Sequence, residues 1–340
     1  MLAAPFPWFG GKSRVAPLVW EAFGDVRNYV EPFFGSGAVL LGRTNVAGIE
    51  TINDLDGFVA NFWRAVAADP DAVAKHADWP VNEADLHARH LWLVANREDL
   101  TLRLMADPAF FDARVAGWWV WGICSWIGSG WCSGNGPWNN VDGRFEKTGN
   151  EGRGVIRQLQ HLGNSGVGVN RNLPHLGDSG RGVNRPGQPI REWFASLRDR
   201  LRGTRVACGD WARVLTNSVA ARHNGGVLTG VFLDPPYSEG EAGYVVGTAT
   251  VSASVREWAI ANGDAKNMRI ALCGYEGEHE MPPDWQCVAW KSKGGYSSSD
   301  GEGRVNSGRE RIWFSPACHR VMRHSTKSQC LLFEAVADGA

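Results

Sequence analysis

The segment NYVEPFFGSGAVLL, residues 28–41, carries the strongest fold signal in the chain. It begins with apolar and aromatic residues typical of a buried strand, continues through a turn with glycines at 35 and 37, and ends with the apolar start of a helix. A second predicted strand, residues 48–53, is followed by Asp54. A strand, a glycine-rich turn, a helix and a second strand form the opening unit of a nucleotide-binding sheet.

The other strand candidates lie far downstream of this unit. From residue 57 to about residue 120, apolar residues recur every three to four positions without a strand signal, so this part is predicted to be helical. A helix is predicted at 190–201, and further strands are predicted at 205–208, 231–233, 269–273, 287–290, 311–314 and 330–333. We therefore predict an α/β fold in which a Rossmann-like sheet, residues 1–56 and 203–340, is interrupted by a mainly helical, loop-rich domain, residues 57–202.

Composition narrows the class of protein. The 340 residues carry a net charge of −1, which excludes a globally basic nucleic-acid coat protein but leaves room for a locally basic face. A hydrophobic content of 44% is sufficient for a sizeable core. The seven cysteines form no CxxC pair, so we expect neither a disulfide framework nor a metal site. Without a signal peptide or a membrane-spanning apolar run, a soluble, cytoplasmic protein is expected.

Two common phosphate-binding motifs are incomplete. The stretch GGKS at 10–13 resembles the end of a P-loop, but the first glycine of that motif is replaced by Phe6, which argues against an NTPase. In a dinucleotide fingerprint the third glycine would fall on Leu40. Because both phosphate-binding motifs are incomplete, the sequence favours an adenosine-like ligand without a pyrophosphate. The main chain would approach this ligand at Gly35 and Gly37, and Asp54 would accept from its ribose hydroxyls. A simple tight turn with a helix cap remains the alternative.

The motif Asp234-Pro235-Pro236-Tyr237 directly follows the predicted strand at 231–233. Two prolines prevent the strand from continuing, so the aspartate carboxylate and a proline carbonyl are held as acceptors at its carboxyl end, beside an aromatic ring. This arrangement suits a flat exocyclic amino group, because two acceptors that hold its hydrogens leave a nitrogen lone pair pointing outward. A Pro-Pro turn with a capping aspartate is the simpler alternative.

Three motifs occur in a fixed order: PWFGGKSR at 7–14, EPFFGSGAV at 31–39 and LDPPY at 233–237. Together they resemble the Dam-like, DPPY-motif DNA adenine N6-methyltransferases, over roughly residues 5–60 and 205–335. The resemblance implies a class I methyltransferase sheet, S-adenosyl-L-methionine as cofactor, a target-recognition domain in the insert, and double-stranded or single-stranded DNA as partner. It also implies that the target adenine is flipped out of the duplex.

The resemblance implies a role for each matching residue. The implied catalytic residues are Asp234, Pro235, Pro236 and Tyr237. The implied cofactor-binding residues are Trp8, Lys12, Phe33, Gly35, Gly37, Asp54, Asp210 and Trp211. No metal is implied. Cytosine N4 methylation, RNA as substrate and an inactive DNA-binding relative remain alternatives, and the sequence gives neither the recognition site nor the oligomeric state nor a restriction partner.

The predicted insert departs from the family pattern that we can align. Between residues 151 and 213, eleven arginines accompany five acidic residues, and residues 303–327 are also basic, so both are candidate phosphate-facing surfaces. A fourteen-residue duplication, 157–170 and 171–184, fits either a DNA-clamping loop or a solvated insertion. Of six tryptophans in a Gly/Ser-rich stretch, at least half are expected in the core and the rest could stack on bases: Trp118, Trp119, Trp121, Trp126, Trp131 and Trp138.

Overall fold

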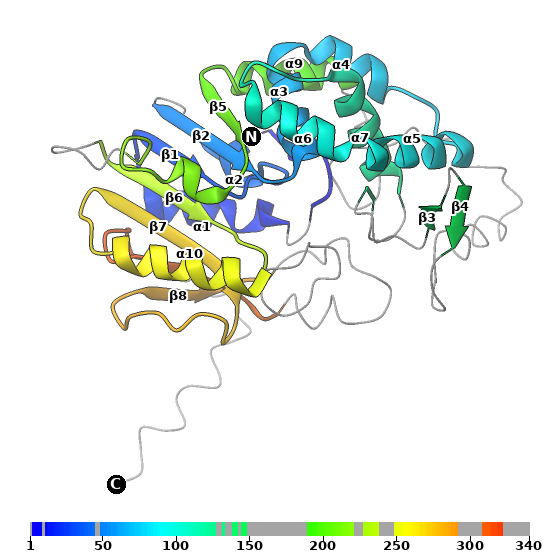
Figure 1. The fold of residues 1–340 in the computed structure, drawn as a ribbon. Helices are drawn as coiled ribbons and strands as arrows, with labels where there is room; N and C mark the ends of the chain where they lie inside the picture. Colours follow the sequence, from blue (N-terminus) through cyan, green and yellow to red (C-terminus); the bar gives the residue numbers. More distant parts are fainter. Residues whose placement is uncertain are drawn as a thin grey trace, which may run out of the picture.

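Seven strands form one sheet in the computed structural model, which describes residues 2–8, 11–44, 48–126, 131–132, 138–141, 144–147, 189–220, 227–237, 248–291 and 308–321. The strands are β1 (Asn28–Glu31), β2 (Ile49–Asp54), β5 (Thr204–Cys208), β6 (Thr229–Leu233), β7 (Met268–Tyr275), β8 (Gln286–Ala289) and β9 (Glu310–Phe314). Their spatial order is β5-β2-β1-β6-β7-β9-β8 (Figure 1). β9 runs antiparallel to the other six strands of this sheet. The predicted Rossmann-like sheet is thereby confirmed, while the strand predicted at 330–333 lies outside the described residues.

The sheet is covered on both faces. Along β6, Phe232 belongs to the apolar cluster that includes helix α1 (Ala16–Phe23), whereas Val231 and Leu233 belong to the cluster that includes helix α10 (Thr248–Asn262). Alternate residues of a strand point to opposite faces, so the two helices lie on opposite sides of the sheet. Figure 1 shows α10 in front of the strands and α1 behind them.

The strand order reverses between β1 and β6. From β1 the chain proceeds outward through β2 to β5, and then it returns to β6 on the other side of β1. In open sheets of this kind, ligands bind outside the carboxyl ends of the strands at such a switch point. The glycine-rich turn follows β1 and the Asp-Pro-Pro-Tyr motif follows β6, so the two strongest sequence motifs lie on either side of this crevice.

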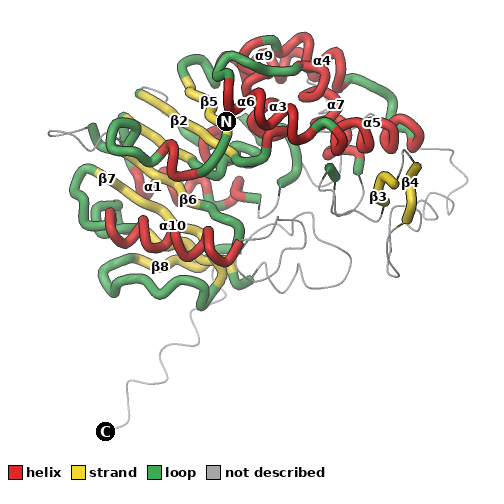
Figure 2. Tube along the Cα trace, viewed as in Figure 1, coloured by secondary structure: helices red, strands yellow, loops and turns green. Residues whose placement is uncertain are grey.

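The helices that connect β2 to β5 gather at the β5 end of the sheet (Figure 2). Residues 57–126 contain no strand, as predicted. Helix α3 contacts β2 and β5, and its apolar residues share one buried cluster with α1 and the sheet. The division into domains at residues 57 and 202 stays a prediction. The helices are α3 (Gly57–Ala68), α4 (Pro70–Ala77), α5 (Glu83–Ala95), α6 (Arg97–Ala106), α7 (Ala113–Ser125) and α9 (Ile190–Arg200).

The tryptophan-rich stretch belongs mainly to the core. Trp119, Trp121, Trp126 and Trp131 are buried, and Trp118 is partly buried against them, which confirms that at least half of these rings pack internally. The side chain of Trp138 lies outside the described residues, although its backbone starts a small hairpin of β3 (Trp138–Val141) and β4 (Arg144–Lys147). The duplicated segment 157–184 is also outside them. Among the described helices, none has the length and apolar character needed to cross a membrane.

A buried ionic cluster attaches α9 to the sheet. The Glu50 carboxylate in β2 accepts hydrogen bonds from Arg43, which follows α2 (Ala38–Leu41), at 2.9 Å and from Arg200 of α9 at 2.7 Å. Thr204, the first residue of β5, donates to the same carboxylate at 3.0 Å. Arg200 was among the arginines predicted to face phosphates, and this prediction is wrong because its side chain is 8% exposed and paired with Glu50.

Candidate active site

The turn after β1 requires glycine at two positions. Gly35 and Gly37 have φ values of +48° and +71°, a left-handed conformation that other residues adopt only with strain. A Cβ atom on Gly35 would lie 2.4 Å from the Trp8 ring, so the ring covers the turn directly. The amide of Gly35 donates to Asp54 Oδ2 at 2.9 Å. The structure thus brings together Trp8, the two glycines and Asp54, which come from three separate segments.

Asn53 joins three strand ends beneath this turn, and sequence reasoning did not select it. Its fully buried side-chain amide donates to the carbonyl of Pro32 at 3.0 Å and to that of Gly209 at 2.9 Å. Its own carbonyl accepts from the amide of Phe34 at 3.0 Å. These bonds connect the carboxyl ends of β1, β2 and β5. The only sequence signal for this role was its position next to Asp54 at the end of a strand.

Asp54 is a carboxylate held by main-chain donors. Its Oδ1 accepts from the amide of Asp56 at 2.9 Å, while Oδ2 accepts from Gly35. Desolvation, together with the neighbouring charge of Asp56, raises the pKa of Asp54 to about 7, although the main-chain hydrogen bonds act in the opposite direction. Each carboxylate oxygen has two acceptor positions, so both oxygens can accept from a ligand hydroxyl as well.

Two aromatic rings face each other across the ends of β1 and β5. The Phe33 and Trp211 rings are nearly parallel, with an interplanar angle of 26° and a centroid separation of 6.3 Å. Both side chains are half-buried. Asp210 is exposed and accepts from the amide of Ala212 at 2.9 Å, which caps the 3₁₀ helix η3 (Trp211–Val214). The three residues, all predicted from the sequence, therefore lie at the same edge of the sheet as Asp54.

Lys12 forms an ion pair with Asp234, with 2.9 Å between Nζ and Oδ2. The two side chains are 8% and 18% exposed. Burial opposes the charged form of Lys12, but the carboxylates of Asp234 and Glu310 outweigh it and raise the lysine pKa, so the side chain stays cationic. Lys12 was expected to line the cofactor pocket, and the structure shows it in contact with the carboxylate of the Asp-Pro-Pro-Tyr motif.

The hydroxyl of Tyr237 lies between two carboxylates. It is 3.1 Å from Asp234 Oδ1 and 3.1 Å from Glu310 Oε2. Burial and these two carboxylates raise the pKa of Tyr237 well above its ordinary value, so the hydroxyl remains a donor. Pro235 is buried and Pro236 half-buried between the two functional side chains of the motif.

Glu310 is the second site residue that sequence reasoning missed. It is buried, 3% exposed, and begins β9 opposite Tyr275, the last residue of β7. Because β9 is antiparallel, its first residue rather than its last lies at the carboxyl edge of the parallel strands. The strand was predicted at 311–314, but its direction and its partner were not, so nothing in the sequence placed Glu310 near Asp234.

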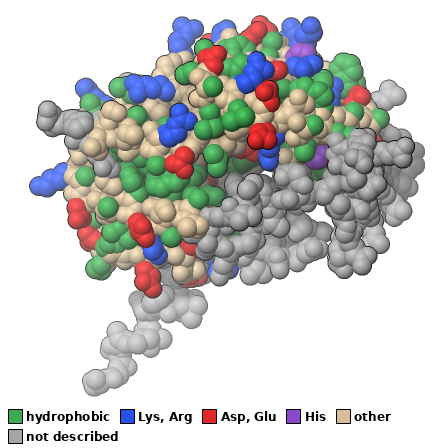
Figure 3. Space-filling model, viewed as in Figure 1, with side chains coloured by type: hydrophobic (Ala, Val, Ile, Leu, Met, Phe, Trp, Pro, Cys, Tyr) green, Lys and Arg blue, Asp and Glu red, His purple; other side chains and the backbone are tan. Residues whose placement is uncertain are grey.

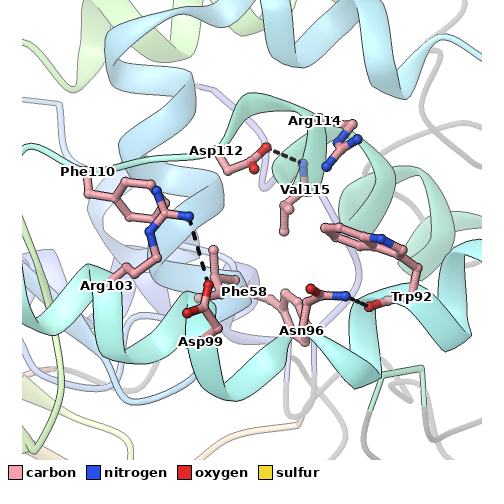
Figure 4. A pocket seen from close by; sticks show the side chains of 10 residues that line it. Phe58, Trp92, Asn96, Asp99, Arg103, Phe110, Asp112, Arg114 and Val115 are labelled. Carbon is pink, nitrogen blue, oxygen red and sulfur yellow. Dashed lines mark hydrogen bonds and ion pairs between the residues drawn. The ribbon is translucent and has the colours of Figure 1, made fainter.

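A cavity of about 150 Å³ in the helical part is separate from this arrangement (Figure 4). Its lining comes from α3, α5, α6, α7 and the segment before α7. Arg103 and Arg114 lie at its sides, and Asp112 caps α7 by accepting from the amide of Val115 at 2.9 Å. None of the predicted site residues lines this cavity. They lie at the carboxyl edge of the sheet, which is therefore the candidate site.

Fold and motifs together match the predicted Rossmann-like arrangement at the switch point. The glycine-rich turn after β1, the acidic residue after β2 and the Asp-Pro-Pro-Tyr motif after β6 all lie at one edge, beside the switch point. Residues 8–97 match the family model of the D12 class N6 adenine-specific DNA methyltransferases. The matched family consists of DNA adenine N6-methyltransferases, which agrees with the resemblance derived from the motifs. No curated protein matches the chain.

Proposed function

We propose that this protein transfers the methyl group of S-adenosyl-L-methionine to the N6 amino group of an adenine flipped out of double-stranded DNA. Asp234, Pro235, Pro236 and Tyr237 form the proposed catalytic motif. The observation that carries the proposal is the position of Asp234, which Lys12 and Tyr237 hold at the switch point beside the glycine-rich turn. Single-stranded DNA is a further proposed substrate, because it presents the base without the cost of unpairing.

The residues at the edge of the sheet fit the cofactor. The Asp54 carboxylate suits ribose hydroxyls, and the nearly parallel faces of Phe33 and Trp211 suit a purine ring. Gly35 and Gly37 let the main chain approach a ligand, while Trp8 supplies an aromatic face that favours a cation. Asp210, at the same edge of the sheet, is proposed to accept from the adenine amino group of the cofactor. When bound, S-adenosyl-L-methionine supplies an electrophilic methyl group on a cationic sulfur.

The chain's own groups prepare the adenine amino group for direct transfer. An Asp234 oxygen and the carbonyl of Pro235 accept the two N6 hydrogens, so the nitrogen lone pair points away from the ring plane. Tyr237 stacks on the base. Lys12 pairs with Asp234 and keeps it a hydrogen-bond acceptor, so the displaced N6 proton leaves to water. A cysteine nucleophile is not required, and burial raises the pKa of the Cys273 thiol in this region.

We further propose that the insert, residues 57–202, holds the DNA and reads its sequence. Its arginine-rich part, 151–188, would contact phosphates. On the face drawn in Figure 3, basic and acidic side chains of the described residues are interspersed rather than gathered by sign. The proposed location is the cytoplasm, where the free cysteines found in the described residues stay reduced.

Mass spectrometry of nucleosides tests the proposed function. Unmethylated duplex and single-stranded DNA are incubated with the protein and S-adenosyl-L-methionine, with Asp234→Ala in parallel. We expect N6-methyladenine from the native protein and none from the variant, while cofactor affinity changes by no more than about threefold. N4-methylcytosine as the product would contradict adenine as the target base. Cofactor binding without any methylated product would instead support an inactive DNA-binding relative.

A further inference from the structure

We infer that Glu310 is a positioning residue that accepts the Tyr237 hydroxyl when the substrate amino group engages Asp234. The inference rests on the proposed function, because it concerns the same catalytic motif. It assigns a task to a side chain that lies outside the motif, on the antiparallel strand β9. Glu310 acts through Tyr237 and does not itself touch the substrate.

The Tyr237 hydroxyl has a single proton and two acceptors. A tyrosine hydroxyl has one hydrogen, so it donates a full hydrogen bond to one acceptor at a time. Tyr237 has two acceptors at the same distance, Asp234 Oδ1 and Glu310 Oε2, both at 3.1 Å. Rotation about the C–O bond of the phenol is therefore sufficient to move the bond from one carboxylate to the other.

The Asp234 carboxylate is already engaged on both sides. Lys12 Nζ lies 2.9 Å from Oδ2, and the Tyr237 hydroxyl is within donor distance of Oδ1. Each oxygen can accept a second hydrogen bond, but an N6 hydrogen of adenine at Oδ1 shares the charge of that oxygen with the Tyr237 hydroxyl. The Tyr237 hydroxyl has a second acceptor within hydrogen-bond distance, Glu310 Oε2. When the Tyr237 hydroxyl leaves Asp234 Oδ1 and donates to Glu310 instead, the hydroxyl still has an acceptor, so no buried donor is left without a partner.

The ring of Tyr237 is held in place while its hydroxyl changes acceptor. Tyr275 packs edge-on against it, with 4.6 Å between ring centroids and 72° between planes. The Lys12 ammonium lies 5.5 Å from the same ring. Glu310 pairs with Tyr275 in the register of β7 and β9, so one antiparallel pair supplies both the ring support and the second acceptor. Substrate engagement thus changes a hydrogen bond without moving the stacking surface.

The first test needs no activity. Tyrosine labelled with ¹³C at Cζ gives one NMR signal for each of the five tyrosines. The signal that is missing in Tyr237→Phe belongs to Tyr237. In Glu310→Gln the Tyr237 signal should shift, because a charged acceptor is replaced by a neutral one of the same size. Glu276→Gln is the matched control, since Glu276 is 63% exposed and pairs with Arg311 on the same strand pair. An unchanged Tyr237 signal in Glu310→Gln would overturn the inference.

The second test is a double-mutant cycle on kcat with unmethylated DNA. Glu310→Gln should lower kcat about tenfold in the native background and by less than about twofold in Tyr237→Phe, where no hydroxyl remains. The dissociation constant of S-adenosyl-L-methionine should stay within about twofold in both. An equal loss of kcat in both backgrounds would show that Glu310 does not act through Tyr237. A native protein that makes no N6-methyladenine would refute the proposed function, while the NMR result would still decide the role of Glu310.

Discussion

The raised pKa of Asp54 predicts that the proposed cofactor binding depends on pH near neutrality. Its pKa is raised to about 7 by desolvation and by the Asp56 carboxylate, so the side chain is mostly protonated at pH 6 and mostly ionised at pH 8. A carboxylate is a stronger acceptor for ribose hydroxyls than a carboxylic acid. We therefore expect the affinity for S-adenosyl-L-methionine to rise between pH 6 and pH 8, measured by isothermal titration calorimetry. Asp54→Asn should bind more weakly and lose most of this pH dependence, and an unchanged dissociation constant would contradict the ribose assignment.

The same carboxyl group affects stability in the opposite direction. Its folded pKa of about 7 exceeds the ordinary value of 3.8, so between these pH values the native state binds more protons than the unfolded state. The free energy of unfolding contributed by Asp54 consequently falls as pH rises through this window. In urea denaturation at pH 4.5 and pH 7.5, Asp54→Asn should show a smaller loss of stability with pH than the native protein. An equal or larger loss would show that Asp54 is not the titrating group.

At the scale of elements, the turn from β1 to α2 depends on Gly35. Gly35→Ala places a Cβ atom 2.4 Å from the Trp8 ring and strains a φ of +48°. We expect a loss of about 2–4 kcal/mol in the free energy of unfolding and a weaker affinity for the cofactor. Urea denaturation and calorimetry measure the two effects.

Gly203→Ala is the matched control for this substitution. Gly203 has a φ of +87°, yet a Cβ atom there would meet nothing within 4 Å. It should therefore lose only about 1 kcal/mol, the contribution of the backbone strain, and leave cofactor affinity unchanged. Equal losses in the two variants would mean that the contact with Trp8 is unimportant.

The Asn53 side chain is expected to hold three strand ends in register. Asn53→Ala leaves the buried carbonyls of Pro32 and Gly209 without their donor, at about 1–3 kcal/mol each. Amide hydrogen exchange should become faster in residues 32–37 and 208–211. Asn96→Ala is the control, because the Asn96 side chain, at the end of α5, donates to the carbonyl of Trp92 one turn earlier in the chain and joins no strand ends. Unchanged exchange in both segments would contradict this role for Asn53.

The elements of the sheet could be predicted from the sequence because each is a short apolar run next to a turn signal. The predicted stretches 28–34, 48–53, 205–208, 231–233 and 311–314 coincide with β1, β2, β5, β6 and β9 to within about three residues. The contacts between distant segments could not be predicted in the same way. The Lys12–Asp234 ion pair and the approach of Glu310 to Tyr237 depend on strand order and on the direction of β9, which local patterns do not encode.

At the scale of the whole molecule, Glu50 connects the returning helix α9 to the sheet. Removing its charge leaves Arg43 and Arg200 buried without their shared carboxylate. Glu50→Gln should therefore lower the free energy of unfolding by about 3–5 kcal/mol, measured by urea denaturation. Asp199→Asn at the end of the same helix is the control, because Asp199 is 59% exposed and its pairing contributes no more than about 1 kcal/mol. A loss below 1 kcal/mol in Glu50→Gln would contradict this connection.

The family match and the sequence motifs cover different residues. The matched residues 8–97 include the glycine-rich turn, Asp54 and Lys12, whereas Asp234 and Tyr237 lie beyond them. Sequence motifs alone supplied this second half of the site, because two prolines after an apolar strand leave few possible conformations. The target sequence could not be predicted, because the central part, 148–188, of the insert proposed to read it lies outside the described residues.

The order of the last strands determines when they can pair during protein synthesis. In the chain β8 precedes β9, but in the sheet β9 lies between β7 and β8. As the chain leaves the ribosome, β8 therefore has no partner until β9 has been made and has paired with β7. Glu310 also enters the site only at that moment. A nascent chain that ends before residue 314 lacks this arrangement, so we expect truncated chains to lack the proposed methyltransferase activity.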